Sequence, residues 1–193
     1  MHPESKEASN LRSMFQLHNM NKEQLEDSIQ KIREGKLCPY CHQSSRHIDS
    51  KEIYGKSYGM VYACLRCDAY IGTHKSNPQL ALGRLANHRL REAKKQAHFW
   101  FDRIARTDLI HKVWPEIMSD MTGRSKAYLW LSKQLGIELE FCHIGMFDEV
   151  GCKAVEEVSR RAIQRIEEGD FEENYNQTLN IIREDRFEFD YMK

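Results

Sequence analysis

No stretch of about 18 consecutive apolar residues occurs in this chain of 193 residues, which excludes a membrane-spanning helix. The polar start, Met1 to Asn10, also lacks the apolar segment of a secretory signal peptide, so we expect a cytoplasmic protein. Neither charge is in excess, because 29 lysines and arginines balance 29 aspartates and glutamates. This balance argues against a histone-like protein, while it leaves room for a local basic face.

The neutral total conceals a basic centre and an acidic end. Residues 75–112 carry nine basic and three acidic side chains, for a charge of +6, whereas residues 138–193 carry seven basic and fifteen acidic ones, for −8. This division is typical either of a polyanion-binding face beside an acidic segment or of parts that pack together or are solvated. Hydrophobic residues make up 40% of the chain, which is enough for a packed core.

Apolar periodicity predicts four helices and a small sheet. We expect helices over residues 21–35, 78–106, 124–135 and 148–169, and strands over 51–54, 58–64 and 68–73. Asn21 with Gln24 resembles a capping box, and Asp148 suits the cap of the last helix. We divide the chain into a loose leader at 1–19, an N-terminal helix at 20–35, a main domain at 36–160 and an acidic C-terminal extension at 161–193.

Four of the six cysteines form two Cys-x-x-Cys pairs, Cys38 with Cys41 and Cys64 with Cys67. Each pair places two sulfurs on one side of a tight turn, and a β-hairpin that joins two such turns supplies the four thiolates that a tetrahedral Zn²⁺ ion prefers. Four cysteine ligands leave no position for water, so the metal is expected to be structural. The fold class that follows is α+β, a four-cysteine zinc ribbon with a small antiparallel sheet packed with three or more helices.

Other interpretations of the cysteines stay open from the residues alone. A redox dithiol, four free cysteines or an iron site are the alternatives to zinc. His42 and His47 lie near enough in the sequence to replace a thiol as ligands. Cys142, His143 and Cys152 would need one more ligand for a second metal, and the alternative is buried free cysteines beside a hydrogen-bonded histidine.

Several ordered blocks of the sequence resemble a known family. They are Cys38-Pro39-Tyr40-Cys41, Val61-Tyr62-Ala63-Cys64, Ala69-Tyr70-Ile71-Gly72-Thr73-His74, Leu82-Gly83-Arg84-Leu85-Ala86 and Cys142-His143-Ile144-Gly145-Met146-Phe147-Asp148. Together they are similar to a bacterial and phage family described as a zinc-finger-containing domain of unknown function. The resemblance implies a zinc-binding fold over residues 36–160 and no established activity.

The basic stretch after the cysteines supplies candidate phosphate contacts, namely Lys75, Arg84, Arg89, Arg91, Lys94 and Lys95, followed by Arg103 and Arg106. The expected ribbon also contains tyrosines that suit stacking on bases, at Tyr54, Tyr58, Tyr62 and Tyr70. The leading hypothesis is a non-enzymatic module with structural zinc that binds DNA or RNA through the basic helix after the ribbon. In the competing interpretation, the tyrosines pack the sheet and the basic side chains lie on a solvated helix face.

Two further functions remain in view. The first is an adaptor that binds a protein partner through the acidic C-terminal helix, within residues 138–193. The second is a nuclease or phosphate-handling enzyme with the catalytic candidates His74, His98, Asp102 and His143. His98 and Asp102 lie one helical turn apart, which suits a general base and its orienting carboxylate, and the alternative is a solvated helix edge.

Overall fold

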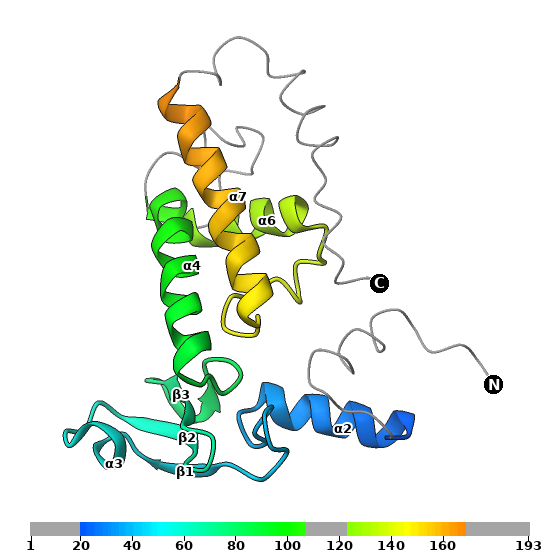
Figure 1. The fold of residues 1–193 in the computed structure, drawn as a ribbon, viewed down its shortest axis with the longest axis vertical. Coiled ribbons are helices and arrows are strands. Elements are labelled where there is room, and N and C mark those ends of the chain that lie inside the picture. The colour runs from blue at the N-terminus through cyan, green and yellow to red at the C-terminus, as the bar shows by residue number, and fades with distance from the viewer. Residues whose placement is uncertain (1–19, 107–122, 169–193) are drawn as a thin grey trace. The chain divides into compact units, whose positions relative to one another are not determined.

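The computed structural model describes residues 20–106 and 123–168, which divide into two compact units. Of the described residues, 20–91 belong to the first unit, and 92–106 with 123–168 belong to the second. Figure 1 labels the helices of both units and the strands β1, β2 and β3. The predicted leader, most of the acidic extension and the side chain of Arg106 lie outside the described part of the chain.

The first unit is built on one antiparallel sheet with the strand order β1-β2-β3-β4. Its strands are β1 (Arg46–Asp49), β2 (Met60–Cys64), β3 (Ala69–His74) and β4 (Asn77–Ala81). Side chains alternate between the two faces of a strand. Tyr62 and Cys64 therefore belong to the apolar cluster that includes the cysteine site, whereas Val61 and Ala63 pack with Ile48 in a second cluster.

Helix α2 (Lys22–Arg33) begins and ends as the sequence predicts. The Asn21 side chain accepts a hydrogen bond from the Gln24 N–H, and the Gln24 side chain accepts one from the Asn21 N–H, so the capping box is confirmed. Gly35 follows the helix with φ of +74°. A Cβ atom at this position would lie 3.0 Å from the Cβ of Ala81 and 3.1 Å from the ring of Tyr62, so glycine also permits a close approach to the sheet.

Two predicted elements of the first unit are wrong. Residues 51–54 form a short helix, α3 (Lys51–Tyr54), because the Asp49 carboxylate accepts a hydrogen bond from the Lys51 N–H at 2.7 Å and Gly55 ends the turn in the left-handed region. Residues 77–81 form β4, which is an edge strand of the sheet in the described residues, and an edge strand tolerates Pro78. The helix expected from residue 78 begins only at His88.

Three helices make up the second unit: α4 (His88–Arg106), which starts in the first unit, α6 (Gly123–Leu135) and α7 (Glu149–Glu167). The Asp148 side chain accepts a hydrogen bond from the Gly151 N–H and caps α7, as predicted. A Cβ atom on Gly123 would lie 2.7 Å from the carbonyl oxygen of Ala105, so glycine allows α6 to start against the end of α4.

The expected α+β fold class is confirmed by this combination of an antiparallel sheet, several helices and a four-cysteine cluster. The largest fully buried side chains of the second unit come from all three helices and include Phe101, Leu131 and Val155. Among the described helices, not one combines the length and the apolar character that a membrane crossing requires.

Candidate functional site

The first cysteine pair lies in a tight turn between α2 and β1. The Cys38 N–H donates to the carbonyl of Gln43 at 2.9 Å, and the His42 N–H donates to the carbonyl of Cys38 at 2.9 Å. His42 has φ of +56°, so the chain reverses directly after Cys41. This reversal presents the sulfurs of Cys38 and Cys41 to the same site.

The second cysteine pair lies in the hairpin turn between β2 and β3. Cys64 ends β2, and the Cys67 N–H donates to the carbonyl of Cys64 at 3.2 Å. Arg91 fastens this turn, because its Nη1 donates to the Asp68 carbonyl at 2.9 Å and its Nη2 lies 3.2 Å from Asp68 Oδ2. The turn is thereby tied to the first turns of α4.

The four predicted thiols converge on one point. Their Sγ atoms all lie within 4.8 Å of one another, and those of Cys41 and Cys64 are 3.6 Å apart. Four sulfurs at 2.3 Å from a tetrahedral zinc ion are about 3.8 Å apart, so this set fits Zn²⁺. All four cysteines are free of disulfides. Within the described ranges, this is the one group of three or more histidine, cysteine or carboxylate side chains close enough to hold a metal ion.

Burial and crowding make metal-free thiolates unfavourable at this place. Burial raises the pKa of Cys38, and it raises the pKa of Cys67 to about 11. Burial also acts to raise the pKa of Cys41, but a backbone hydrogen bond at Gln43 and the neighbouring sulfurs outweigh it and lower this pKa. Thiolates packed so closely repel one another, and a divalent cation removes that repulsion.

The alternative histidine ligands lie outside this cluster. The ring of His47 stacks on Tyr62 with 4.6 Å between the centroids, and its Nε2 lies 2.9 Å from the carbonyl oxygen of Pro78. Tyr62 is itself buried, and its hydroxyl donates to the carbonyl of Gln79 at 3.0 Å. The rings of His47 and Tyr62 therefore pack on the sheet.

A row of aromatic and cationic side chains covers part of the first unit, and we call it the aromatic strip: Lys56, Tyr58, Tyr54, Tyr70 and Arg91. The ring of Tyr54 lies edge to face with those of Tyr58 and Tyr70, with centroids 5.9 Å and 5.7 Å away. Lys56 Nζ is 5.7 Å from the centroid of Tyr58, and the guanidinium carbon of Arg91 is 4.0 Å from that of Tyr70. Tyr58 is 71% exposed and Tyr54 is 51% exposed, so both offer ring surface to a ligand.

The turn in which Tyr58 is exposed contains a short motif that also occurs in hydrolases. Gly55-Lys56-Ser57-Tyr58-Gly59 has the Gly-x-Ser-x-Gly spacing of a hydrolase nucleophile elbow, which joins a strand to a helix. Here the segment joins α3 to β2 instead, and the Ser57 hydroxyl donates to Asp49 Oδ2 at 2.8 Å. Ser57 therefore stabilises the turn through this hydrogen bond.

Four of the six predicted phosphate-contacting residues lie at or near the surface. Lys75 is exposed in the turn between β3 and β4, and Arg89 and Lys95 are exposed on α4. Lys95 pairs with Glu92 at 2.6 Å. Arg91 is half-buried between Asp68 and the ring of Tyr70. It therefore packs within the aromatic strip and is only partly exposed at the surface.

The other two predicted contacts are buried. Arg84 is 3% exposed and lies in the loop before α4, with its guanidinium carbon 6.0 Å from the ring centroid of Tyr40. Lys94 is 8% exposed, and its Nζ donates to the carbonyl of Gly145 at 2.7 Å. Side chains buried to this extent do not reach an external phosphate.

Three of the four catalytic candidates come together in the second unit, whereas His74 lies on β3 in the first. Arg124 joins two of them, because its Nη1 donates to Asp102 Oδ1 at 2.6 Å and its Nη2 lies 3.4 Å from Nδ1 of His98. The third, His143, stacks on Tyr128 with 5.5 Å between centroids and 9° between ring planes.

Arg124 and Tyr128 contact these candidates, although no motif in the sequence marks either residue. They lie one helical turn apart on α6, which is the only signal that the sequence holds for them. Their position beside α4 depends on the close approach at Gly123, a tertiary contact.

The suggested second metal site does not form in the described residues. Cys142 and Cys152 are buried and form no disulfide, and burial raises the pKa of Cys142 to about 12. The ring of His143 accepts a hydrogen bond at Nδ1 from the Gly145 N–H at 3.1 Å. This is the alternative arrangement of buried cysteines beside a hydrogen-bonded histidine.

Comparison with known proteins agrees with the cysteine geometry. The sequence model of a family described as a zinc-finger-containing domain matches residues 34–162, a range that includes both cysteine pairs and the aromatic strip. No curated protein and no solved structure matches the chain. Since the family match covers more than half of the sequence, the chain belongs to this zinc-finger-containing family.

Proposed function

We propose that this chain is a zinc-bearing module that binds single-stranded nucleic acid through its aromatic strip. The observation that carries the proposal is two exposed tyrosine rings in a row with cations: Lys56 lies over Tyr58, and Tyr54 contacts Tyr70, over which Arg91 lies. Each base that stacks on an aromatic side chain contributes about 1–3 kcal/mol. Lysine and arginine side chains beside the rings neutralise the phosphates.

In this proposal, zinc has a structural role. The four thiolates fill its tetrahedral coordination, so the ion stabilises the two cysteine turns and leaves no position for a reacting water. The second turn is continuous with β3, which carries Tyr70. Arg91 connects Asp68 of that turn to the ring of Tyr70, so metal binding supports the geometry of the aromatic strip.

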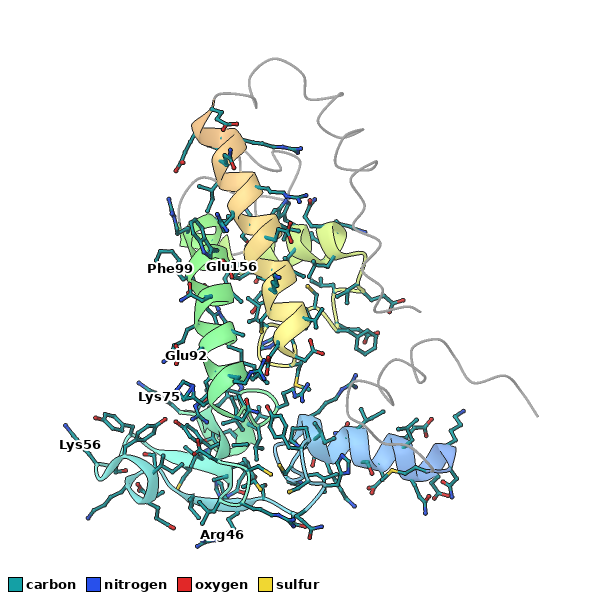
Figure 2. The ribbon with its side chains drawn as sticks, viewed as in Figure 1. Arg46, Lys56, Lys75, Glu92, Phe99 and Glu156 are labelled. Atoms are coloured by element: carbon teal, nitrogen blue, oxygen red, sulfur yellow. The ribbon has the colours of Figure 1, made fainter. Side chains whose placement is uncertain are left out.

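The charges around the strip also favour a polyanion. Lys56 and Lys75 project outward from the first unit (Figure 2). Burial first, and then the neighbouring Tyr70, raise the pKa of Tyr54 to about 12, so this ring carries no negative charge at neutral pH. We prefer a single strand to a duplex because only unpaired bases expose their faces for stacking. Buried Arg84 and Lys94 take no part.

The test is a fluorescence anisotropy titration of the full, zinc-loaded chain with labelled single-stranded DNA, single-stranded RNA and duplex DNA at two salt concentrations. Tyr58→Ala is expected to weaken single-strand binding by roughly ten-fold. Tyr58→Phe retains the ring and is expected to bind nearly as the natural protein does. Phe99→Ala is the matched control, because Phe99 is an exposed ring on α4 outside the strip.

Lys56→Gln tests the electrostatic part separately. It is expected to reduce the slope of log K against log salt by about 0.7, the value for one phosphate contact on a single strand. The proposal is wrong if no nucleic acid binds in a salt-dependent way, or if Tyr58→Ala binds as tightly as Phe99→Ala. The adaptor hypothesis stays a prediction, because much of the acidic segment lies outside the described residues.

A further inference from the structure

The two exposed rings of the aromatic strip are perpendicular to each other. The planes of Tyr54 and Tyr58 meet at 86°, with 5.9 Å between the ring centroids. Tyr54 is also perpendicular to the ring on its other side, that of Tyr70, at 89°. A base that stacks on a tyrosine lies parallel to the ring. Two bases that stack on Tyr54 and Tyr58 therefore lie in planes that are nearly at right angles.

Hydrogen bonds from the end of β1 hold the turn that carries Tyr58. Asp49 is the last residue of β1, and its Oδ2 accepts a hydrogen bond from the Ser57 hydroxyl at 2.8 Å. The next residue, Ser50, accepts a hydrogen bond at its hydroxyl from the Tyr58 N–H at 2.7 Å. The Ser50 N–H donates to the carbonyl of Gly59 at 3.0 Å. Asp49 and Ser50 thus bind three consecutive residues of the turn.

The same two residues hold the backbone that carries Tyr54. Asp49 Oδ1 accepts a hydrogen bond from the Lys51 N–H at 2.7 Å, and the Tyr54 N–H donates to the carbonyl of Ser50 at 2.9 Å. The backbone beneath both exposed rings is therefore attached to the end of β1, and edge-to-face packing sets the angle between the rings. Because the protein is organised before a ligand binds, the bound strand has to adapt its conformation to the rings.

Perpendicular rings favour a strand whose bases stack weakly on one another. Neighbouring bases of a stacked single strand lie in parallel planes, so they separate when each stacks on one of two perpendicular rings. Adenine runs stack strongly and lose this free energy on binding, whereas thymine and uracil runs have little stacking to lose. A purine offers a larger face to a tyrosine, but it has that advantage at a single ring as well. The arrangement of two rings is therefore what disfavours purine runs.

We propose that the aromatic strip selects pyrimidine-rich single strands, because the perpendicular rings of Tyr54 and Tyr58 require two neighbouring bases to unstack. This inference rests on the nucleic-acid binding proposed above and adds the class of sequence that the strip binds. The selection acts through the conformation of the strand and needs no hydrogen bond to a base edge. Lys56, which lies over the ring of Tyr58, contacts phosphates equally well in every sequence.

The experiment compares homo-oligomers of equal length on the full, zinc-loaded chain. Fluorescence anisotropy measures the affinity for an oligothymidylate and for an oligodeoxyadenylate at one salt concentration. Both strands carry the same number of phosphates, so the electrostatic part of binding is the same for the two. The thymine strand is expected to bind roughly five-fold more tightly. Oligouridylate and oligoadenylate of the same length test the preference in RNA, where the same direction is expected.

Two variants identify the origin of the preference. Tyr58→Ala leaves a single exposed ring, so neighbouring bases no longer have to unstack, and the ratio of the thymine to the adenine affinity is expected to fall towards one. Ser57→Ala retains both rings but removes the hydrogen bond to Asp49, so the turn is freer and the ratio is expected to decrease. Ser76→Ala, at an exposed serine in the turn between β3 and β4, is the matched control and should keep the ratio of the natural protein.

The comparison of strands on the natural protein decides the question even if a variant does not fold. Equal affinity for the two strands, or tighter binding of the adenine strand, would overturn the selection and leave nucleic-acid binding by the strip intact. A thymine preference that persists unchanged in folded Tyr58→Ala would also overturn it, because the preference would then arise away from the paired rings. If neither strand binds, the selection and the proposed function both fail.

Discussion

The hydroxyl of Tyr40 accepts a hydrogen bond from the backbone N–H of Asn87 at 3.1 Å. Tyr40 lies between the first two cysteine ligands, and Asn87 is the residue before α4. The Asn87 side chain accepts a hydrogen bond from the Leu90 N–H and caps that helix. The first cysteine turn and the start of α4 are therefore one connected structure within the first unit.

We expect Tyr40→Phe to lower the free energy of unfolding by about 1 kcal/mol, because the substitution leaves a half-buried backbone N–H without its acceptor. Urea unfolding followed by circular dichroism measures this change. Zinc content is expected to stay the same, since the phenyl ring still packs on the cysteine site. A protein with unchanged stability would show that water replaces the hydroxyl at no cost.

Removal of the metal is expected to unfold the first unit. The four thiols converge where the two cysteine turns meet, and structural zinc sites contribute directly to folding. A strong chelator, or Cys64→Ser, should therefore abolish the NMR signals of residues in the strands β2 and β3. Cys152→Ala, at a buried cysteine outside the cluster, is the control and should keep a full equivalent of zinc. Retention of the sheet signals without metal would contradict this expectation.

Alanine substitutions at two glycines can separate the free-energy cost of a strained backbone conformation from the cost of steric crowding. Gly35 and Gly136 both have positive φ, +74° and +63°. A Cβ atom at Gly136 meets nothing within 4 Å, whereas one at Gly35 meets Ala81 and Tyr62 at 3.0–3.2 Å. We expect Gly136→Ala to cost about 1–2 kcal/mol from conformation alone. Gly35→Ala should cost about 1–3 kcal/mol more because of overpacking. Equal losses in urea unfolding would show that the sheet yields to the added methyl.

His98 makes the stability of the second unit depend on pH. Burial lowers its pKa in the folded protein, so the unfolded chain, with an ordinary pKa of about 6.5, binds the proton first as the pH falls. The free energy of unfolding should therefore decrease below about pH 6.5 and stop changing, as far as His98 is concerned, below its folded pKa. Urea unfolding between pH 5 and pH 8 measures the slope. His98→Asn is expected to reduce it, and an identical slope in the variant would assign the dependence to other groups.

Local patterns in the sequence were sufficient where an element depends on its own residues. The capping box at Asn21, the cap at Asp148 and the left-handed Gly35 all follow from interactions within three or four residues, and the structure confirms them. The pattern was insufficient at residues 51–54, where the Asp49 carboxylate starts a helical turn in a β-prone segment. It also failed at Pro78, because a proline suits an edge strand as well as a helix start.

The candidate site residues also divide into those that a local sequence pattern identifies and those that only tertiary contacts bring together. Cys-x-x-Cys spacing is a local signal, so the four cysteines could be selected from the sequence. Basic residues carry no such signal of exposure: Lys94 is buried with its Nζ on the Gly145 carbonyl, which lies 51 residues further along the chain. Arg124 could not be selected at all, because its partners Asp102 and His98 come from another helix.

By itself, the sequence determined the cysteine cluster, the α+β class and the family, because a metal site with four thiols requires particular residues at short, fixed spacings. Only the tertiary structure decided which tyrosines face solvent and which pack the sheet, since Tyr58 and Tyr62 differ in burial and not in local pattern. It also decided that Arg124 contacts Asp102 and His98, and that Tyr128 stacks on His143. Contacts between distant segments arise from the packing of whole elements, and the residues of one segment do not specify them.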